Sequence, residues 1–233
     1  MLQSMLGRKI GMTSVYNNDG DRVQVTVLEA GPCFVTQVKT VKTDGVNAVQ
    51  LGFGKARVKN TIKPVQGIFK KAKVDPLSII RQFRIAEEPK FNLGDVVKVD
   101  IFEGTNKVDI IGTTKGKGFQ GVVKRYRKAS GPKSHGSMNV RTTGSVGASA
   151  FPSRVRPNMH MPGHMGNERY TSKNLEIVKI DAQNNLLLVK GSVPGYEGNF
   201  VVITKSDNQK FKGRGPAPVD KDKKQPTAKP KRK

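Results

Sequence analysis

Short runs of alternating apolar and polar residues recur in both halves of the chain and predict β-strands. They cover 22–30, 34–40, 47–53, 95–102, 107–113 and 199–205, and the run 175–193 predicts a hairpin that turns near Asn184 and Asn185. Turn-forming residues at 17–20 and 44–47 separate some of these runs. One short helix is predicted over 63–72, with Pro64 in its first turn.

This pattern predicts a mainly β fold built around a closed β-barrel, because closure removes exposed sheet edges. The strand-rich stretches lie on either side of a middle segment that lacks apolar periodicity, and neither side has many strands by itself. We therefore expect the two sides to form one body, with the middle segment inserted between two strands of one barrel.

The charged residues are distributed very unevenly. Residues 1–109 carry 17 basic against 11 acidic side chains, residues 110–167 carry 10 against 0, residues 168–204 carry 4 against 4, and residues 205–233 carry 11 against 3. The 58 residues between Asp109 and Glu168 contain no acid, yet hold ten glycines and all three histidines. Because this segment can bury little, we expect a long extension whose shape is set by a partner.

The total charge indicates what that partner is. A formal net charge of +24 favours nucleic acid first and an anionic membrane surface second. No apolar run approaches the ~20 residues of a membrane span, and the start of the chain has no secretory apolar core. We expect a cytoplasmic protein without a membrane partner, beginning at either Met1 or Met5. The Pro- and Lys-rich residues 206–233 predict a disordered basic tail.

Nucleotide chemistry is the first alternative for the glycine-rich stretch 113–125, TTKGKGFQGVVKR. A phosphate-binding loop needs the pattern G-x-x-x-x-G-K-[ST] followed by a helix. The glycine spacing here differs, and the β-branched residues after Gly121 predict that no helix follows. These two departures argue against a nucleotide site.

Metal and acid–base chemistry also find little support. His160 and His164 have helical ligand spacing, but Pro162 and Gly163 between them prevent a helix. Residues 110–167 have no carboxylate, and a lone Cys33 predicts a buried thiol rather than a disulfide or zinc site. We expect no enzyme activity, no metal or other cofactor and no small-molecule substrate.

The remaining interpretation is recognition of an RNA backbone. Lysines between glycines let a main chain approach phosphates closely, arginines bridge phosphates, and tyrosine can stack on an unpaired base. A merely soluble charged loop would normally mix both signs of charge. The predicted RNA-binding residues are Arg8, Lys9, Lys115, Gly116, Lys117, Gly118, Gly121, Lys124, Arg125, Tyr126, Arg127, Lys128, Lys133, His135, Arg141, Arg154, Arg156, His160, His164 and Arg169.

Four ordered stretches carry a resemblance to a known family. The first is FEGTNKVDIIGTTKGKGFQGVVKR at 102–125, and the others are GRKIGMT at 7–13, PGHMGNERYT at 162–171 and NLLLVKGSVPG at 185–195. Together they resemble the ribosomal protein L3 family of the large ribosomal subunit, bacterial type, over about residues 5–205.

The resemblance implies a translation-protein-type β-barrel with a small α+β insertion at about 55–95. Residues 1–112 and 169–205 would form the body on the outer side of the subunit, and residues 113–168 would run into ribosomal RNA. The resemblance also implies early binding in assembly, neighbouring large-subunit proteins, and an extension tip at about 144–154 near the peptidyl transferase centre. We expect the extension to order on RNA and to position it, without supplying a reacting group.

Two departures from the family pattern stand out. Ala150 occupies the position of a glutamine that is modified in many bacterial relatives, so that modification is not expected here. Tyr126 replaces a common tryptophan and keeps an aromatic face. A general RNA chaperone or DNA-compacting protein is the alternative that explains the charge, although not the ordered motifs.

Overall fold

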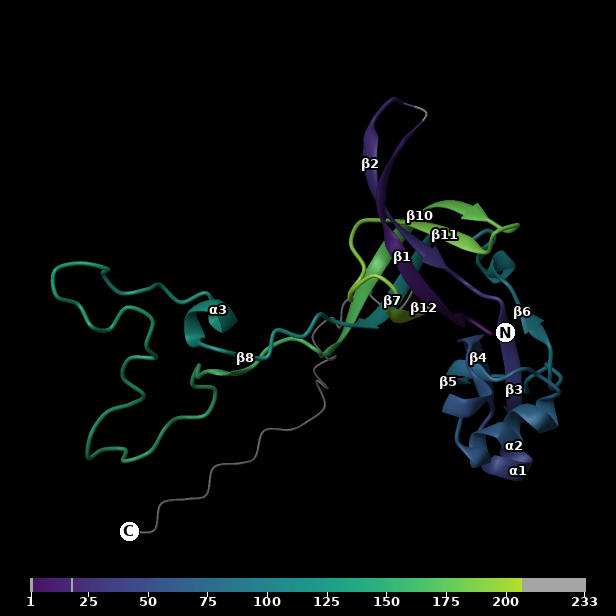
Figure 1. The fold of residues 1–233 in the computed structure, drawn as a ribbon, viewed down its shortest axis with the longest axis horizontal. Helices are drawn as coiled ribbons and strands as arrows, with labels where there is room; N and C mark the ends of the chain where they lie inside the picture. Colours follow the sequence, from purple (N-terminus) through teal and green to yellow (C-terminus); the bar gives the residue numbers. More distant parts are fainter. Residues whose placement is uncertain (1, 18, 207–233) are drawn as a thin grey trace, which may run out of the picture.

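Six antiparallel strands close into a barrel in the computed structural model, which describes residues 2–17 and 19–206. In barrel order these are β1 (Ser4–Tyr16), β12 (Phe200–Lys205), β7 (Lys107–Thr113), β10 (Arg169–Asp181), β11 (Leu186–Lys190) and β2 (Arg22–Glu29) (Figure 1). The barrel draws strands from both sides of the basic segment. The predicted closed barrel and the single body are therefore confirmed.

Strand β1 joins the barrel to a projecting hairpin. Its first half pairs with β12 and its second half with β2, and the register shifts between Lys9 and Gly11. Beyond this bulge, β1 and β2 continue as a two-stranded ribbon that rises above the barrel (Figure 1). Asn17 and Gly20 close the ribbon by a backbone hydrogen bond of 2.9 Å, at the predicted turn.

A second, four-stranded sheet packs beside the barrel with two helices (Figure 1). Its order is β5 (Leu77–Arg84), β4 (Ala48–Lys55), β3 (Cys33–Lys39) and β6 (Val96–Val97). Helix α1 (Val41–Asp44) and the short 3-10 helix η1 (Val58–Asn60) lie in the connections between its strands. Helix α2 (Lys63–Ala72) has the predicted bounds and buries Phe69 and Ala72. The sheet includes β3 and β4, which precede the expected start of the α+β insertion at residue 55.

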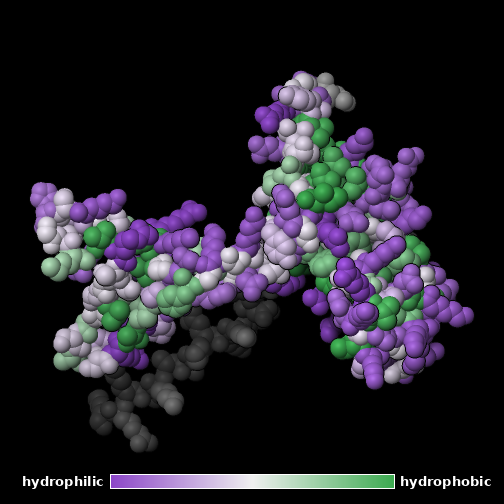
Figure 2. All heavy atoms as spheres, in the orientation of Figure 1, coloured by the Kyte–Doolittle hydropathy of each residue, from purple (hydrophilic) through white to green (hydrophobic). Residues whose placement is uncertain are grey.

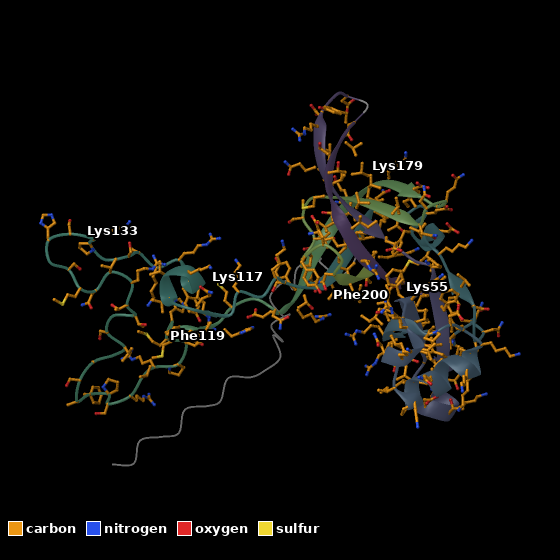
Figure 3. The ribbon with its side chains drawn as sticks, in the orientation of Figure 1. Lys55, Lys117, Phe119, Lys133, Lys179 and Phe200 are labelled. Atoms are coloured by element: carbon orange, nitrogen blue, oxygen red, sulfur yellow. The ribbon has the colours of Figure 1, made fainter. Side chains whose placement is uncertain are left out.

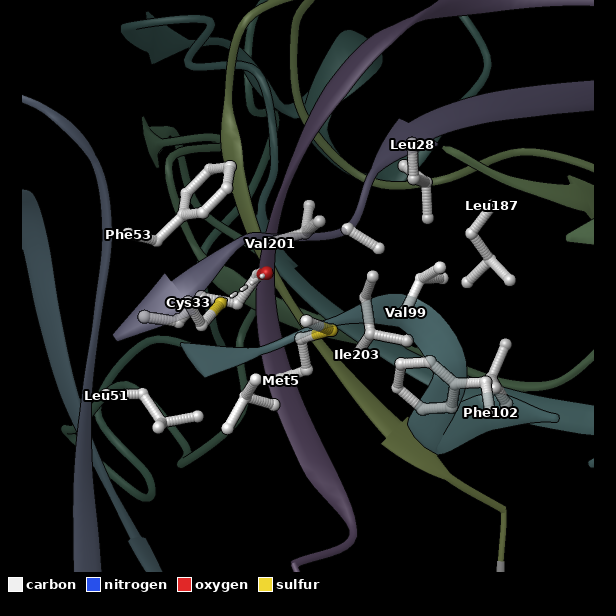
Figure 4. Close-up of a cluster of buried hydrophobic side chains, with 14 of the residues drawn as sticks. Met5, Leu28, Cys33, Leu51, Phe53, Val99, Phe102, Leu187, Val201 and Ile203 are labelled. Atoms are coloured by element: carbon white, nitrogen blue, oxygen red, sulfur yellow. Dashed lines mark hydrogen bonds between the residues drawn. The ribbon is translucent and has the colours of Figure 1, made fainter. Parts of the chain in front are cut away.

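One hydrophobic core joins the barrel to the second sheet. Met5, Leu187 and Ile203 come from barrel strands, whereas Leu51 and Phe53 come from β4, and all of them belong to one buried cluster (Figure 4). The predicted burial of Cys33 is confirmed, because its side chain is fully buried and its Sγ lies 3.2 Å from the Leu6 carbonyl oxygen. Burial raises the pKa of this thiol to about 12.

Some predicted elements are wrong or incomplete. The strand expected over 95–102 shrinks to the two residues of β6, followed by the 3-10 helix η2 (Val99–Phe102). Val99 and Phe102 are both fully buried, and their spacing suits one turn of a 3-10 helix better than one face of a strand. The predicted hairpin does turn at 182–185, but β10 begins at Arg169 rather than near 175. Strands β1 and β5 were not predicted.

Among the described residues, no helix is long and apolar enough to cross a membrane. The expected basic tail, 206–233, lies outside the described residues from 207 onward.

Candidate nucleic-acid interface

The extension, residues 113–168, leaves the barrel between β7 and β10 (Figure 1). These neighbouring strands pair up to Thr113 and Arg169. The pairing continues outward: the Thr114 amide donates to the Glu168 carbonyl at 2.9 Å, and the Lys117 amide donates to the Met165 carbonyl at 2.9 Å. We call residues 113–120 and 163–169 the root ladder, because both legs of the extension are tied together there.

Two short strands end the root ladder and one short helix follows it. Strand β8 (Phe119–Gln120) pairs with β9 (Gly163–His164), and helix α3 (Val122–Tyr126) begins after Gly121. The prediction that no helix follows Gly121 is therefore wrong. Its β-branched Val122 is almost fully buried at the start of α3, and this tertiary packing outweighs the weak helix propensity of valine.

The glycines of the root have different roles, and one of them lets the two legs approach each other closely. A Cβ at Gly166, whose φ is 75°, would overlap the carbonyl oxygen of Lys115 and come within 3.1 Å of Gly116 Cα. Gly118 has a φ of 65° but no atom within 4 Å of where its Cβ would be, so it serves to turn the chain. The close approach in the structure is between the two legs of the protein at Gly166, and the predicted approach of the other root glycines to phosphates stays a prediction.

A stack of side chains binds α3 to the returning leg. The rings of Tyr126 and His160 are parallel within 8°, with centroids 4.1 Å apart. The Arg125 guanidinium lies over the Tyr126 ring, 5.0 Å from its centroid, and its Nη1 donates to the Met161 carbonyl at 2.9 Å. A Cβ at Gly163 would come within 2.6 Å of that Nη1. Arg125 therefore braces the extension, a role that its prediction as an RNA-binding residue did not include.

The outer part of the extension, 127–162, contains no assigned helix or strand and few backbone hydrogen bonds. One bond, from the Gly131 amide to the Val140 carbonyl at 2.9 Å, closes a loop near its middle. Met138 and Phe151 are 94% and 90% exposed, values unusual for large apolar side chains. A surface of this kind is typical of a segment that is covered by a partner.

Most predicted contact residues lie on the surface of this extension. Hydrophilic side chains cover most of it, with hydrophobic ones in small separate patches (Figure 2), and side chains such as Lys117 and Lys133 point outward from it (Figure 3). Arg125 and Lys128 are half-buried. The exposed cationic or imidazole side chains are Lys115, Lys117, Lys124, Arg127, Lys133, His135, Arg141, Arg154, Arg156, His160, His164 and Arg169.

A groove of about 620 Å³ runs along one face of the root ladder. Lys115, Lys117 and Arg125 line it together with Tyr126 and the carboxyl-bearing Glu168. Cationic side chains beside an aromatic one are typical of sites that hold the backbone of a single strand. Among the described residues, no group of three possible metal ligands occurs.

Arg8 and Lys9 do not belong to this surface. The buried Lys9 Nζ donates to the Val193 carbonyl at 2.9 Å and lies 3.4 Å from the Gly195 carbonyl. Burial lowers the pKa of Lys9, and the charge of Lys115 lowers it further, while Glu197 opposes the shift. Arg8 is half-buried over the Phe200 ring, at 5.2 Å from its centroid. Both cations therefore act inside the body.

A loop at 191–199 supports the point where the extension leaves the barrel. Lys9 holds this loop from one side, and Asn199 Nδ2 donates to the Thr113 carbonyl at 3.1 Å. The Gly198 amide donates to the Lys9 carbonyl at 2.7 Å. No charge pattern marks Asn199 in the sequence, so this support could be found only from the fold.

A mainly β body that carries a long, exposed and strongly basic extension is typical of a structural nucleic-acid-binding protein. Comparison with known proteins then gives the family. The model of the family described as ribosomal protein L3 matches residues 67–186. The large ribosomal subunit protein uL3 of Thermosipho melanesiensis is 52% identical over 87% of this chain and 97% of its own length. The protein of the same name from Alkaliphilus metalliredigens is 48% identical, covering 87% and 96%.

The chain belongs to the ribosomal protein L3 family. This confirms the resemblance carried by the four motifs. Proteins of this family are structural and non-enzymatic components of the large ribosomal subunit, located with the ribosome in the cytoplasm. The chain is accordingly a structural protein of that subunit and not an enzyme.

Proposed function

We propose that the extension binds large-subunit ribosomal RNA by neutralising its phosphates. One observation carries the proposal: residues 110–167 have ten cationic side chains and no acidic one, and most of those cations are exposed. In a compact free protein this charge would repel itself. Phosphates remove the repulsion, and the released counterions favour binding.

The body and the extension have different tasks in this proposal. The barrel and second sheet share one core and form a rigid base, which lies on the outer side of the subunit beside other large-subunit proteins. The outer part of the extension, with few internal hydrogen bonds, orders on RNA. It binds early in assembly and ties RNA segments from different regions into one geometry.

The tip of the extension, residues 144–154, approaches the peptidyl transferase centre. Its effect on that centre is through the position of RNA, because the acid-free tip has no carboxylate or histidine for proton transfer. Arg154 is exposed there and supplies a phosphate contact.

Salt dependence of RNA binding tests the proposal. We compare the intact chain with a triple variant, Lys124→Ala, Arg127→Ala and Lys128→Ala, on a large-subunit RNA fragment. Arg125 is left unchanged because it braces the extension. The slope of log affinity against log salt should shrink by roughly 0.7–0.9 for each phosphate that the variant no longer neutralises.

A second triple variant, Lys63→Ala, Lys70→Ala and Lys71→Ala, provides the control. It removes the same charge from exposed positions on α2, in the body. If both triple variants change the slope equally, the extension has no special part in binding. Equal affinity for duplex DNA would instead support a DNA-compacting or general RNA-chaperone function.

A further inference from the structure

The stack of Tyr126 and His160 ends in an open aromatic face. The two rings are 4.1 Å apart and nearly parallel, so each covers one face of the other. The Arg125 guanidinium also lies over the Tyr126 ring. His160, however, is exposed, and no second ring contact to it occurs among the described residues. The imidazole therefore presents its outer face to solvent.

Contacts of the neighbouring backbone, together with the stacked ring of Tyr126, hold this imidazole in place. Met161, the next residue, accepts a hydrogen bond from Arg125 Nη1 at 2.9 Å, and Arg125 belongs to the same helix as Tyr126. At Gly163, the absent side chain leaves room for the guanidinium. A ring fixed before binding loses little conformational entropy when a ligand stacks on it.

The surroundings indicate the class of ligand. Lys124 and Arg127 are exposed on α3 and just after it, and residues 110–167 contain no acid. A flat ring flanked by cations suits a nucleobase, because the base stacks while its phosphates meet the cations. If the stack served only to fix α3 to the returning leg, the ring at its end would not need to be exposed.

We propose that the outer face of His160 stacks on an unpaired base of the RNA that the extension binds. The inference rests on the proposed function and assigns one base-stacking site within it. Tyr126, which was predicted to stack on a base, instead supports the ring that does so.

Binding of short single strands by the full chain tests this site. The probes are oligoadenylate, oligouridylate of equal length, and an abasic oligomer with the same number of phosphates. His160→Ala should weaken oligoadenylate binding by about 5- to 150-fold, the range for loss of one base stack. The loss should be smaller for oligouridylate and absent for the abasic oligomer, with the salt slope unchanged.

Two further variants separate stacking from other roles. His160→Phe keeps an aromatic face and should restore most of the affinity. Tyr16→Ala removes an exposed ring of the body, on β1, that has no ring partner among the described residues, and it should leave binding unchanged. In nuclear magnetic resonance spectra, oligoadenylate should shift the His160 ring protons upfield and leave those of Tyr16 in place.

Equal losses in His160→Ala and Tyr16→Ala, or a loss that extends to the abasic oligomer, would overturn the stacking site. An unshifted His160 resonance at saturating oligoadenylate would do the same. Failure of the proposed function gives a different result: the intact chain would then bind none of the three probes with a salt-dependent affinity.

Discussion

Replacing Gly166 with alanine should open the root ladder and leave the body folded. A Cβ at this position would overlap the carbonyl oxygen of Lys115 and lie 3.1 Å from Gly116 Cα. Both atoms are backbone, so no side-chain rotation relieves the overlap. The two legs of the extension have to separate at this point, or the chain has to leave its φ of 75°.

Two contributions set the magnitude. An alanine in the left-handed region costs about 1–2 kcal/mol relative to glycine. Separation of the legs also breaks the hydrogen bonds that join Lys117 to Met165 at 2.9 Å and Met165 to Gly118 at 3.0 Å. Each such bond contributes about 0.5–1.5 kcal/mol. The root ladder should therefore lose about 2–5 kcal/mol of local stability.

Two neighbouring glycines separate these contributions. Gly118→Ala carries the backbone cost alone, since nothing lies within 4 Å of its Cβ position at a φ of 65°. Gly116→Ala adds only an ordinary contact, 3.6 Å from Asn167 Cβ. Destabilisation of the root ladder should therefore be smallest in Gly116→Ala, larger in Gly118→Ala and largest in Gly166→Ala.

Hydrogen exchange of the Lys117 and Met165 amides measures the effect directly, because both amides bond within the root ladder. Exchange of barrel amides should stay as in the unchanged chain. The reasoning fails if these two amides are as well protected from exchange in Gly166→Ala as in Gly118→Ala, because the overlap with the opposite leg would then have no energetic cost.

Three other predictions concern the body. Phe102→Ala empties a fully buried site in the shared core, so it should lower the free energy of unfolding, measured in urea, by about 3–5 kcal/mol. A decrease under about 1 kcal/mol would mean that the barrel and second sheet do not depend on one core. Lys9→Met leaves the Val193 carbonyl without its donor, so amides at 193–199 should exchange faster, and unchanged exchange would show that the bond does not hold the loop. Burial raises the pKa of the Cys33 thiol from 9.0 to about 12, so the thiol should resist alkylation until the chain unfolds. The thiol binds its proton more tightly in the folded chain. Its contribution to stability is therefore constant below about pH 9 and disappears as the pH rises from there toward 12. A flat alkaline stability curve in the chain, but a falling one in Cys33→Ala, would contradict that sign.

The strands were predictable where alternation was regular. In β7 the side chains of Val108 and Ile110 are buried, and in β12 those of Val201 and Ile203, as their alternating apolar positions predict. Strand β1 was missed because glycines and two consecutive cations, Arg8 and Lys9, interrupt its pattern. Strand β5 was missed because its residues are only partly buried beyond Leu77, which leaves a weak signal at the edge of the sheet.

The extension was predictable from charge, because its surface character depends on composition alone. The roles of individual cations were not. Arg125 and Lys124 are adjacent in the sequence and equally basic, yet one bonds to Met161 and the other is exposed. Which of them reaches solvent depends on the return of residues 160–163 to α3, and contacts over such sequence distances leave no local pattern.

Composition and periodicity thus determined that the chain is mainly β, that its strands form one body, and that an acid-free, strongly basic segment projects from it. The order of the hydrophobic and charged residues suffices for these features. Apolar alternation is a local property of each strand, and net charge is a sum over each segment, so neither depends on which distant residues meet. The tertiary structure alone decided that Lys9 points into the body, that Gly166 lies against the opposite leg, and that the ring of Tyr126 stacks on that of His160. Each of these depends on a pair of residues far apart in the chain, and only the closed barrel, with its two legs paired at the root, brings such pairs together.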